Sequence, residues 1–214
     1  MRAQPLRPRR GADGFTLIEL LVAIVILGII TVPLSNVVIA YLRNTDATTA
    51  RLIESHDAQI TSAYWAQDVA SIGTRETTTP FGFTQSVETG VANNSGLYPC
   101  GAAGNAIVRL AWDDSSGPGA ATLVRVAYVV QAAPGQTLLT ELHRLRCEGS
   151  AAVVSDVTLA HDLDPSTLPV LECSTTCTGS PAVPKTVTLT LTIKDPKNLG
   201  GAYVVRLTGE RRQS

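Results

Sequence analysis

The sequence is poor in aromatic residues and has almost no net charge. Phe, Trp and Tyr make up 5% of its 214 residues, and 17 Lys and Arg face 18 Asp and Glu, for a formal net charge of −1. A nucleic-acid-binding protein needs a basic face, so we predict no nucleic-acid partner. The hydrophobic share of 44% suffices for a packed core and excludes a disordered chain.

The motifs of the common enzyme classes are also missing. The sequence holds no Gly-rich phosphate loop, Walker motif or dinucleotide fingerprint. Its three histidines, His56, His143 and His161, are far apart and accompany no Ser/His/Asp order or nucleophile elbow. We therefore predict no enzymatic activity, no catalytic residue and no cofactor.

Loop carboxylates are the candidates for calcium, a hard cation that prefers oxygen ligands. They are Asp113, Asp114, Asp156, Asp162 and Asp164. Their spacing fits no EF-hand, so solvated turn residues are the preferred interpretation and we predict no metal site.

Charge is nearly absent from one long segment. From Phe15 to Tyr41 the only formally charged side chain is Glu19. The stretch 15–42 has 28 residues, whereas a bilayer core needs about 20. A carboxylate inside a membrane segment costs roughly 2.5–3.5 kcal/mol on insertion scales, so the presence of Glu19 calls for a reason.

Four arginines precede this segment, with Asp13 as the only acid among them. Positive-inside bias then places residues 1–14 in the cytoplasm and the bulk of the chain outside. A removed secretory signal is the alternative, but it would have a shorter apolar core and a small-residue cleavage site. The apolar run instead continues to Leu42 with no clear Ala-x-Ala site, so we expect the helix to be retained.

Residues 14–27 read Gly-Phe-Thr-Leu-Ile-Glu-Leu-Leu-Val-Ala-Ile-Val-Ile-Leu. This segment closely resembles the N-terminus of type IV pilins and type II secretion pseudopilins. The resemblance implies that prepilin peptidase cleaves between Gly14 and Phe15 and that Phe15 is then N-methylated. Many leaders of the family carry a basic residue before the glycine, whereas this one ends in Ala12-Asp13-Gly14; the glycine is the main requirement, so cleavage is still expected.

Glu19 is the fifth residue after the implied cut, where the family carries its glutamate. Cleavage creates an ammonium group at Phe15, and a carboxylate one helical turn away can pair with the ammonium of a neighbouring subunit. Each charge is costly alone in a low dielectric and tolerable when paired. Glu19 is therefore assigned to subunit assembly. The alternative is a carboxylate that snorkels to the membrane edge.

The resemblance also implies partners, location and function. The partners are prepilin peptidase, other pilins or pseudopilins, the inner-membrane assembly platform, and membrane lipid before assembly. The location is the bacterial cytoplasmic membrane, followed by a pilus or pseudopilus. We expect a minor pilin-like structural subunit; the alternative is a J-class pseudopilin of a type II secretion system, and a remote one is a membrane-anchored extracellular binding module or enzyme.

We predict an α+β fold in which a long helix packs on an antiparallel sheet. The division is a leader at 1–14, a transmembrane and filament-core helix at 15–42, an amphipathic helical half at 43–72, and an extracytoplasmic β-rich head at 73–214. Ile53, Ile60 and Tyr64 form one apolar stripe of the second half, and the residues Trp65, Val69 and Ile72 form an adjoining one. The residues assigned to its polar faces include Asp57 and Asp68.

Pro33 removes one backbone donor, so we predict a kink or a locally melted turn near residues 28–33. Residues 73–105 lack periodicity and are expected to form a long connection with at most one short strand. Strands are expected at 107–112, 122–130, 138–147, 153–159, 185–194 and 202–208. The pair 124–130 and 138–144 weakly resembles a hairpin of minor pilins and J-class pseudopilins, in which a strand with a tyrosine precedes one with Leu-x-Arg.

The four cysteines, Cys100, Cys147, Cys173 and Cys177, all lie in the part expected to be exported. An even number in an oxidising compartment favours disulfides, and three connectivities are possible. We favour a local Cys173–Cys177 loop and a Cys100–Cys147 bond that ties the long connection to the sheet. Structural zinc prefers shorter, regular pairs, which makes zinc the weaker alternative, together with free thiols.

Overall fold

The computed structural model describes residues 14–75, 82–102, 104–117, 120–135, 139–179, 183–194 and 202–212. Apart from Gly14, the expected leader lies outside the described residues. The chain divides into two compact units between Thr48 and Thr49. We call them the N-terminal unit and the C-terminal unit.

One helix, α1 (Leu17–Ser71), runs through both units. It starts directly after Thr16 and ends before Gly73, whose φ of 142° is accessible to glycine and ends the helical backbone. A helix of this extent followed by an antiparallel sheet confirms the predicted α+β fold.

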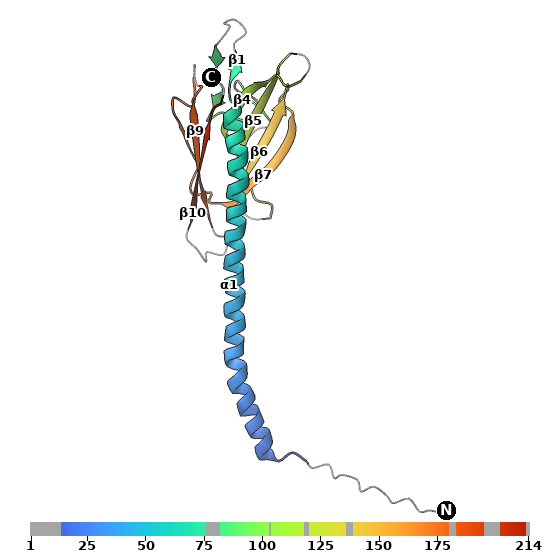
Figure 1. Ribbon diagram of the computed structural model, residues 1–214. Helices are drawn as coiled ribbons and strands as arrows, with labels where there is room; N and C mark the ends of the chain where they lie inside the picture. Colours follow the sequence, from blue (N-terminus) through green and yellow to red (C-terminus); the bar gives the residue numbers. More distant parts are fainter. Residues whose placement is uncertain are drawn as a thin grey trace, which may run out of the picture. The chain divides into compact units, whose positions relative to one another are not determined.

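Pro33 does not interrupt α1, so the prediction of a locally melted turn is wrong. The backbone stays helical from Gly28 to Pro33, and the Thr31 hydroxyl donates a hydrogen bond of 2.9 Å to the carbonyl of Leu27. Figure 1 shows the N-terminal part of α1 curved rather than broken. Proline lacks the backbone N–H that would bond to the preceding turn, and a helix can bend at this missing hydrogen bond while the neighbouring turns stay helical.

The C-terminal unit contains an antiparallel sheet of eight strands in the order β10-β9-β7-β6-β5-β4-β3, with β8 also paired to β9. The consecutive strands β4 to β7 are neighbours in this sheet and form a meander. Separate from it, β1 pairs with β2. The strands are β1 (Thr74–Arg75), β2 (Phe83–Thr84), β3 (Val87–Glu88), β4 (Ala106–Asp114), β5 (Thr122–Ala132), β6 (Thr140–Glu148), β7 (Val153–Leu163), β8 (Val170–Cys173), β9 (Thr186–Ile193) and β10 (Tyr203–Glu210).

The part of α1 inside the C-terminal unit packs against this sheet (Figure 1), with β9 and β10 on one side of it and β4 to β7 on the other. The buried positions of this part recur at helical spacing and form one face; they are Asp57, Thr61, Trp65, Asp68 and Val69, and Ile72, directly after the helix, is buried as well. The predicted stripe of Trp65, Val69 and Ile72 is therefore confirmed.

Two parts of that helix prediction are wrong. Asp57 and Asp68 were assigned to polar faces, yet they are 6% and 1% exposed. Ile53, assigned to the apolar stripe, is 48% exposed. The burial of the two aspartates has a physical cause: hydrophobic periodicity ranks a carboxylate as a surface residue, whereas a carboxylate that gains hydrogen-bond partners can be buried.

The connection after α1 has more structure than expected, with three two-residue strands, β1 to β3, where at most one was predicted. It also supplies core residues, since Tyr98 is 7% exposed and Cys100 is fully buried. These strands depend on pairing with distant segments, such as β3 with β4, and a local sequence pattern does not contain that information.

Candidate functional site

The first turn of α1 is closed by reciprocal hydrogen bonds between Thr16 and Glu19. The Thr16 amide donates to Glu19 Oε2 at 2.9 Å, and the Glu19 amide donates to Thr16 Oγ1 at 3.3 Å. The Thr16 hydroxyl donates to the same carboxylate oxygen at 2.9 Å. This is a capping box, in which a threonine before the helix and a glutamate three residues later satisfy free amides of the first turn.

Apolar side chains surround this turn and continue along the N-terminal unit. Every described side chain from Gly14 to Asp46 is exposed. The helix contains an 18-residue window with a mean hydropathy of 2.8, none of it buried, so α1 is long and apolar enough to cross a membrane. Glu19 therefore places a carboxylate near the start of a segment suited to lipid or to other apolar helices.

Comparison with known families matches this region. Residues 9–35 match the family model described as the prokaryotic N-terminal methylation motif. The chain has the N-terminal motif of type IV pilins and pseudopilins. Comparison with curated proteins and with solved structures yields no match.

Around the prepilin-type motif, the backbone at the expected cut is accessible. Gly14 and Phe15 lie outside α1 in irregular backbone. A Cβ atom on Gly14 would meet nothing within 4 Å, and Phe15 is 90% exposed. Proteolysis concentrates in exposed backbone outside regular secondary structure, and Gly14 and Phe15 lie in such backbone immediately before the helix.

Thr16 was missed in the sequence as a partner of Glu19. The signal was present, because Thr-x-x-Glu before an apolar run is the sequence signature of a capping box. The signature adds a function to Glu19, which stabilises its own helix end in addition to the expected role between subunits.

In the C-terminal unit, a buried ion pair fastens α1 to the sheet. Arg144 of β6 makes a bidentate contact with Asp68 of α1, with both N–O distances 2.7 Å. The Tyr128 hydroxyl of β5 donates to Asp68 Oδ2, also at 2.7 Å. Tyr128 and Arg144 are cross-strand partners in the hairpin that resembled minor pilins, so the sheet register brings both to one carboxylate.

Burial and charge shift the proton affinities in this cluster. Burial, reinforced by the Asp68 carboxylate, raises the pKa of the Tyr128 hydroxyl well above its ordinary value. Burial disfavours the Arg144 charge, but the hydrogen bonds and charge of Asp68 outweigh that effect, so the pKa of Arg144 is raised. Both shifts favour the protonated state in which the cluster is bonded.

Three further side chains of α1 bond to the backbone of the sheet. Thr61 donates to the carbonyl of Leu159 in β7 at 2.9 Å. The Trp65 indole donates to the carbonyl of Val187 in β9 at 3.2 Å. Asp57 accepts the amide of His161 at 2.9 Å. Strands β7 and β9 pair with each other at one position, Leu163 with Ile193. Because α1 bonds to both strands, it connects them where they do not pair directly.

The structure pairs the cysteines in the connectivity that the sequence analysis favoured. Cys100 bonds to Cys147 across 47 residues, and Cys173 bonds to Cys177 across four. The first bond attaches the connection after α1 to β6, and the second closes a turn after β8. The Cα atoms of the two pairs are 5.7 and 5.4 Å apart.

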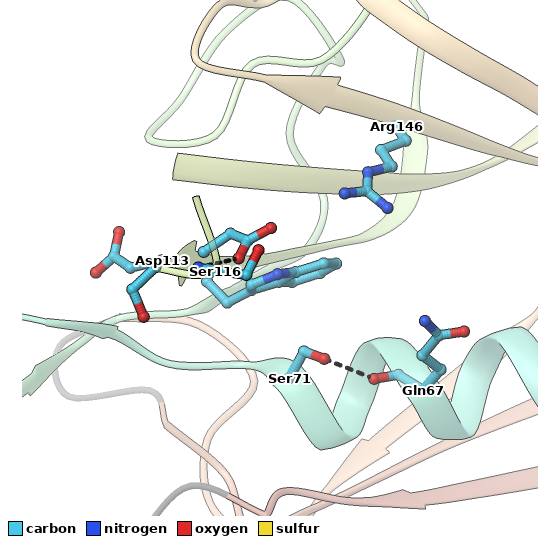
Figure 2. A pocket seen from close by; sticks show the side chains of 8 residues that line it. Gln67, Ser71, Asp113, Ser116 and Arg146 are labelled. Atoms are coloured by element: carbon cyan, nitrogen blue, oxygen red, sulfur yellow. Dashed lines mark hydrogen bonds between the residues drawn. The ribbon is translucent and has the colours of Figure 1, made fainter. Parts of the chain in front are cut away.

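The C-terminal unit also has a polar cleft of about 510 Å³. Figure 2 shows Gln67 of α1 and Arg146 of β6 pointing toward one another across it. The charged lining residues have local partners: Arg146 pairs with Glu148 at 2.9 Å, Asp113 accepts the Arg75 amide, and Asp114 accepts the Ser116 amide. The bonds of Asp113 and Asp114 hold the end of β4 and the turn after it. Within the described ranges, no three His, Cys, Asp or Glu side chains are grouped to hold a metal ion.

Proposed function

We propose that this protein is a minor pilin-like structural subunit of a type IV pilus or a related filament. Prepilin peptidase removes residues 1–14, Phe15 is N-methylated, and the retained helix enters the filament core. The observation that carries the proposal is the methylation motif at residues 9–35, with Glu19 as the one charge in the apolar run that follows the cut.

Glu19 changes its partner when the subunit enters the filament. Before assembly its carboxylate is bonded to Thr16 in the same chain. Cleavage leaves an ammonium group on Phe15, and in a filament the ammonium of a neighbouring subunit can pair with Glu19 within an apolar helical core. An ion pair in a low dielectric is favourable where both partners are present and costly where one is missing, so the pairing selects a correctly placed subunit.

The proposed role is assembly rather than catalysis. The same motif serves pilus subunits and secretion pseudopilins, and the weak hairpin resemblance supports the minor class in either kind of filament. The N-terminus then lies in the cytoplasm and the C-terminal unit outside the cytoplasmic membrane, as the arginines of the leader favour.

The intact mass of the membrane-extracted protein tests the proposal. We expect a species that begins at Phe15 and carries one added methyl group in cells with prepilin peptidase. The control is the same protein from cells without the peptidase, which should keep residues 1–14. A protein that keeps these residues in cells with active peptidase would refute the proposed function.

A further inference from the structure

Between β3 and β4 the chain contains an unusually neutral stretch. The 20 residues from 89 to 108 include no Asp, Glu, Lys, Arg or His. The charged residues at its two borders, Glu88 and Arg109, are cross-strand partners in the sheet. Arg109 Nη2 lies 2.9 Å from Glu88 Oε2, and their side chains are 1% and 8% exposed.

The buried pair is bonded to the backbone of one loop, residues 93–98, which we call the 93–98 loop. Glu88 accepts the amides of Leu97 and Tyr98 at 3.2 and 3.3 Å. Arg109 Nη1 donates to three carbonyl oxygens of the loop, those of Asn93, Ser95 and Tyr98. The hydrogen bonds of the ion pair thus specify the path of this loop.

Other contacts fix the same loop. Gly96 has a φ of 79°, and a Cβ atom there would clash with the Glu88 carboxylate, so the backbone closes directly over the ion pair. The Tyr98 hydroxyl donates to the carbonyl of Gln85. Just beyond the loop, Cys100 is bonded to Cys147. The ion pair therefore holds the middle of the loop, and the disulfide holds the chain just after its C-terminal end.

The tip of this fixed loop presents a large apolar side chain. Leu97 is 59% exposed, whereas its neighbours Tyr98 and Cys100 are buried. A single exposed leucine is ordinary. Leu97 differs from other exposed leucines because a buried ion pair, Glu88 with Arg109, holds the loop that carries it. A buried ion pair seldom stabilises a protein more than apolar residues of similar size would, and this pair fixes the conformation of the loop. A loop already fixed in one conformation loses little entropy on binding.

We propose that the 93–98 loop is a contact site that inserts Leu97 into an apolar pocket of a neighbouring filament subunit. The identity of the partner rests on the proposed function. The neutral tip supports a protein partner, since interface cores are depleted of charged residues. A phosphate or another charged ligand would instead require charged groups at the tip, and residues 93–98 have none.

Site-specific photocrosslinking in filament-producing cells tests this site. A photoreactive amino acid replaces Leu97 in the full chain, and a second variant carries it at Leu168, which is 80% exposed in irregular backbone just before β8. We expect position 97 to crosslink to a second subunit with a prepilin-type N-terminus, and we expect the yield of that crosslink to exceed the yield from position 168, because a photoreactive group at an interface is held against its partner.

A substitution pair gives an independent measurement. Leu97→Asp should lower incorporation into sheared filaments about tenfold, whereas Leu168→Asp should leave it unchanged. Tryptophan fluorescence of each variant reports whether the C-terminal unit is folded, and Leu97→Ala replaces Leu97→Asp if the latter unfolds.

Three results would overturn the inference. They are equal crosslink yields at the two positions, a crosslinked partner without a prepilin-type N-terminus, and wild-type incorporation of folded Leu97→Asp. Cleavage at Gly14 is measured in the same samples. Uncleaved protein overturns both the proposed function and this inference, whereas cleaved subunits in filaments without a Leu97 crosslink overturn the inference alone.

Discussion

At the scale of single residues, Glu19 combines two roles that need different properties of its side chain. Its oxygens accept the amide and hydroxyl of Thr16, which needs an acceptor but no charge. The proposed pairing with a neighbour's ammonium needs the negative charge. Glutamine retains an acceptor and lacks the charge, so Glu19→Gln removes the charge alone, whereas alanine removes both properties.

We expect Glu19→Gln and Glu19→Ala both to be cleaved and to stay in the membrane, and both to be absent from sheared filaments. Thr16→Val, which removes the hydroxyl of the cap but keeps the charge, should still enter filaments. Immunoblots of membrane and filament fractions measure the distribution. Normal incorporation of Glu19→Gln would rule out the charge-pairing role.

Gly209 in β10 lies where the sheet closely approaches α1. A Cβ atom there would be 2.5 Å from Cβ of Val69. We expect Gly209→Ala to lower the free energy of unfolding by about 1–3 kcal/mol through overpacking. The additional change Val69→Ala should offset part of that loss, a coupling that a double-mutant cycle measures.

The control for this prediction is Gly117→Ala, because a Cβ atom at Gly117 meets nothing within 4 Å. Its effect should stay within about 0.5 kcal/mol. Additive effects of Gly209→Ala and Val69→Ala would contradict the proposed clash. Denaturant unfolding of the detergent-solubilised chain can be followed by fluorescence, since both tryptophans, Trp65 and Trp112, lie in the C-terminal unit.

At the scale of elements, polar bonds as well as apolar contacts join α1 to the sheet. The indole of Trp65 meets the Tyr128 ring edge-on at 5.0 Å between centroids, and beside it Asp68 accepts from Tyr128 and Arg144. One turn of the helix thereby contacts the adjacent strands β5 and β6 through both kinds of interaction. The polar bonds specify which residue of the helix meets which strand. Apolar contacts alone are less directional and do not specify this.

The raised pKa of Tyr128 predicts a loss of stability at high pH. A folded-state pKa above the unfolded value of about 10 stabilises the fold below pH 10, and the contribution is lost as pH rises through the folded pKa. The free energy of unfolding should therefore fall above about pH 10, and less steeply in Tyr128→Phe. At pH 7 that variant should lose about 2 kcal/mol, for a hydrogen bond to a carboxylate.

Denaturant unfolding between pH 7 and 11 measures this dependence. Tyr203→Phe is the matched control, since Tyr203 is 47% exposed at the start of β10, and it should follow the wild-type curve. An alkaline slope in Tyr128→Phe equal to that of the wild type would show that this hydroxyl does not contribute.

At the scale of the whole molecule, the two disulfides constrain very different lengths of chain. By the loop-entropy relation, the 47-residue separation of Cys100 and Cys147 stabilises by about 4 kcal/mol, and the four-residue separation of Cys173 and Cys177 by about 2 kcal/mol. Replacing the first pair by serines should therefore lower the melting temperature of the C-terminal unit more than replacing the second pair. The opposite order would mean that native-state contacts around Cys173 outweigh chain entropy.

The N-terminal features could be predicted from the sequence because they depend on local order. The long apolar run from Phe15 onward indicates a helix suited to a membrane. The glycine before it and the single carboxylate, Glu19, complete the methylation and cleavage motif. Period-two alternation likewise placed most of the strands, since a strand alternates its faces whatever it pairs with.

The tertiary structure alone decided which charges are buried. Asp68 and Asp57 follow the spacing of a surface face in the sequence, and Glu88 and Arg109 are separated by 20 uncharged residues. Each is buried because the fold brings a partner from far along the chain: Arg144, His161, or, for the last two, each other. Long-range pairing sets the burial of a charge, and no local pattern records it.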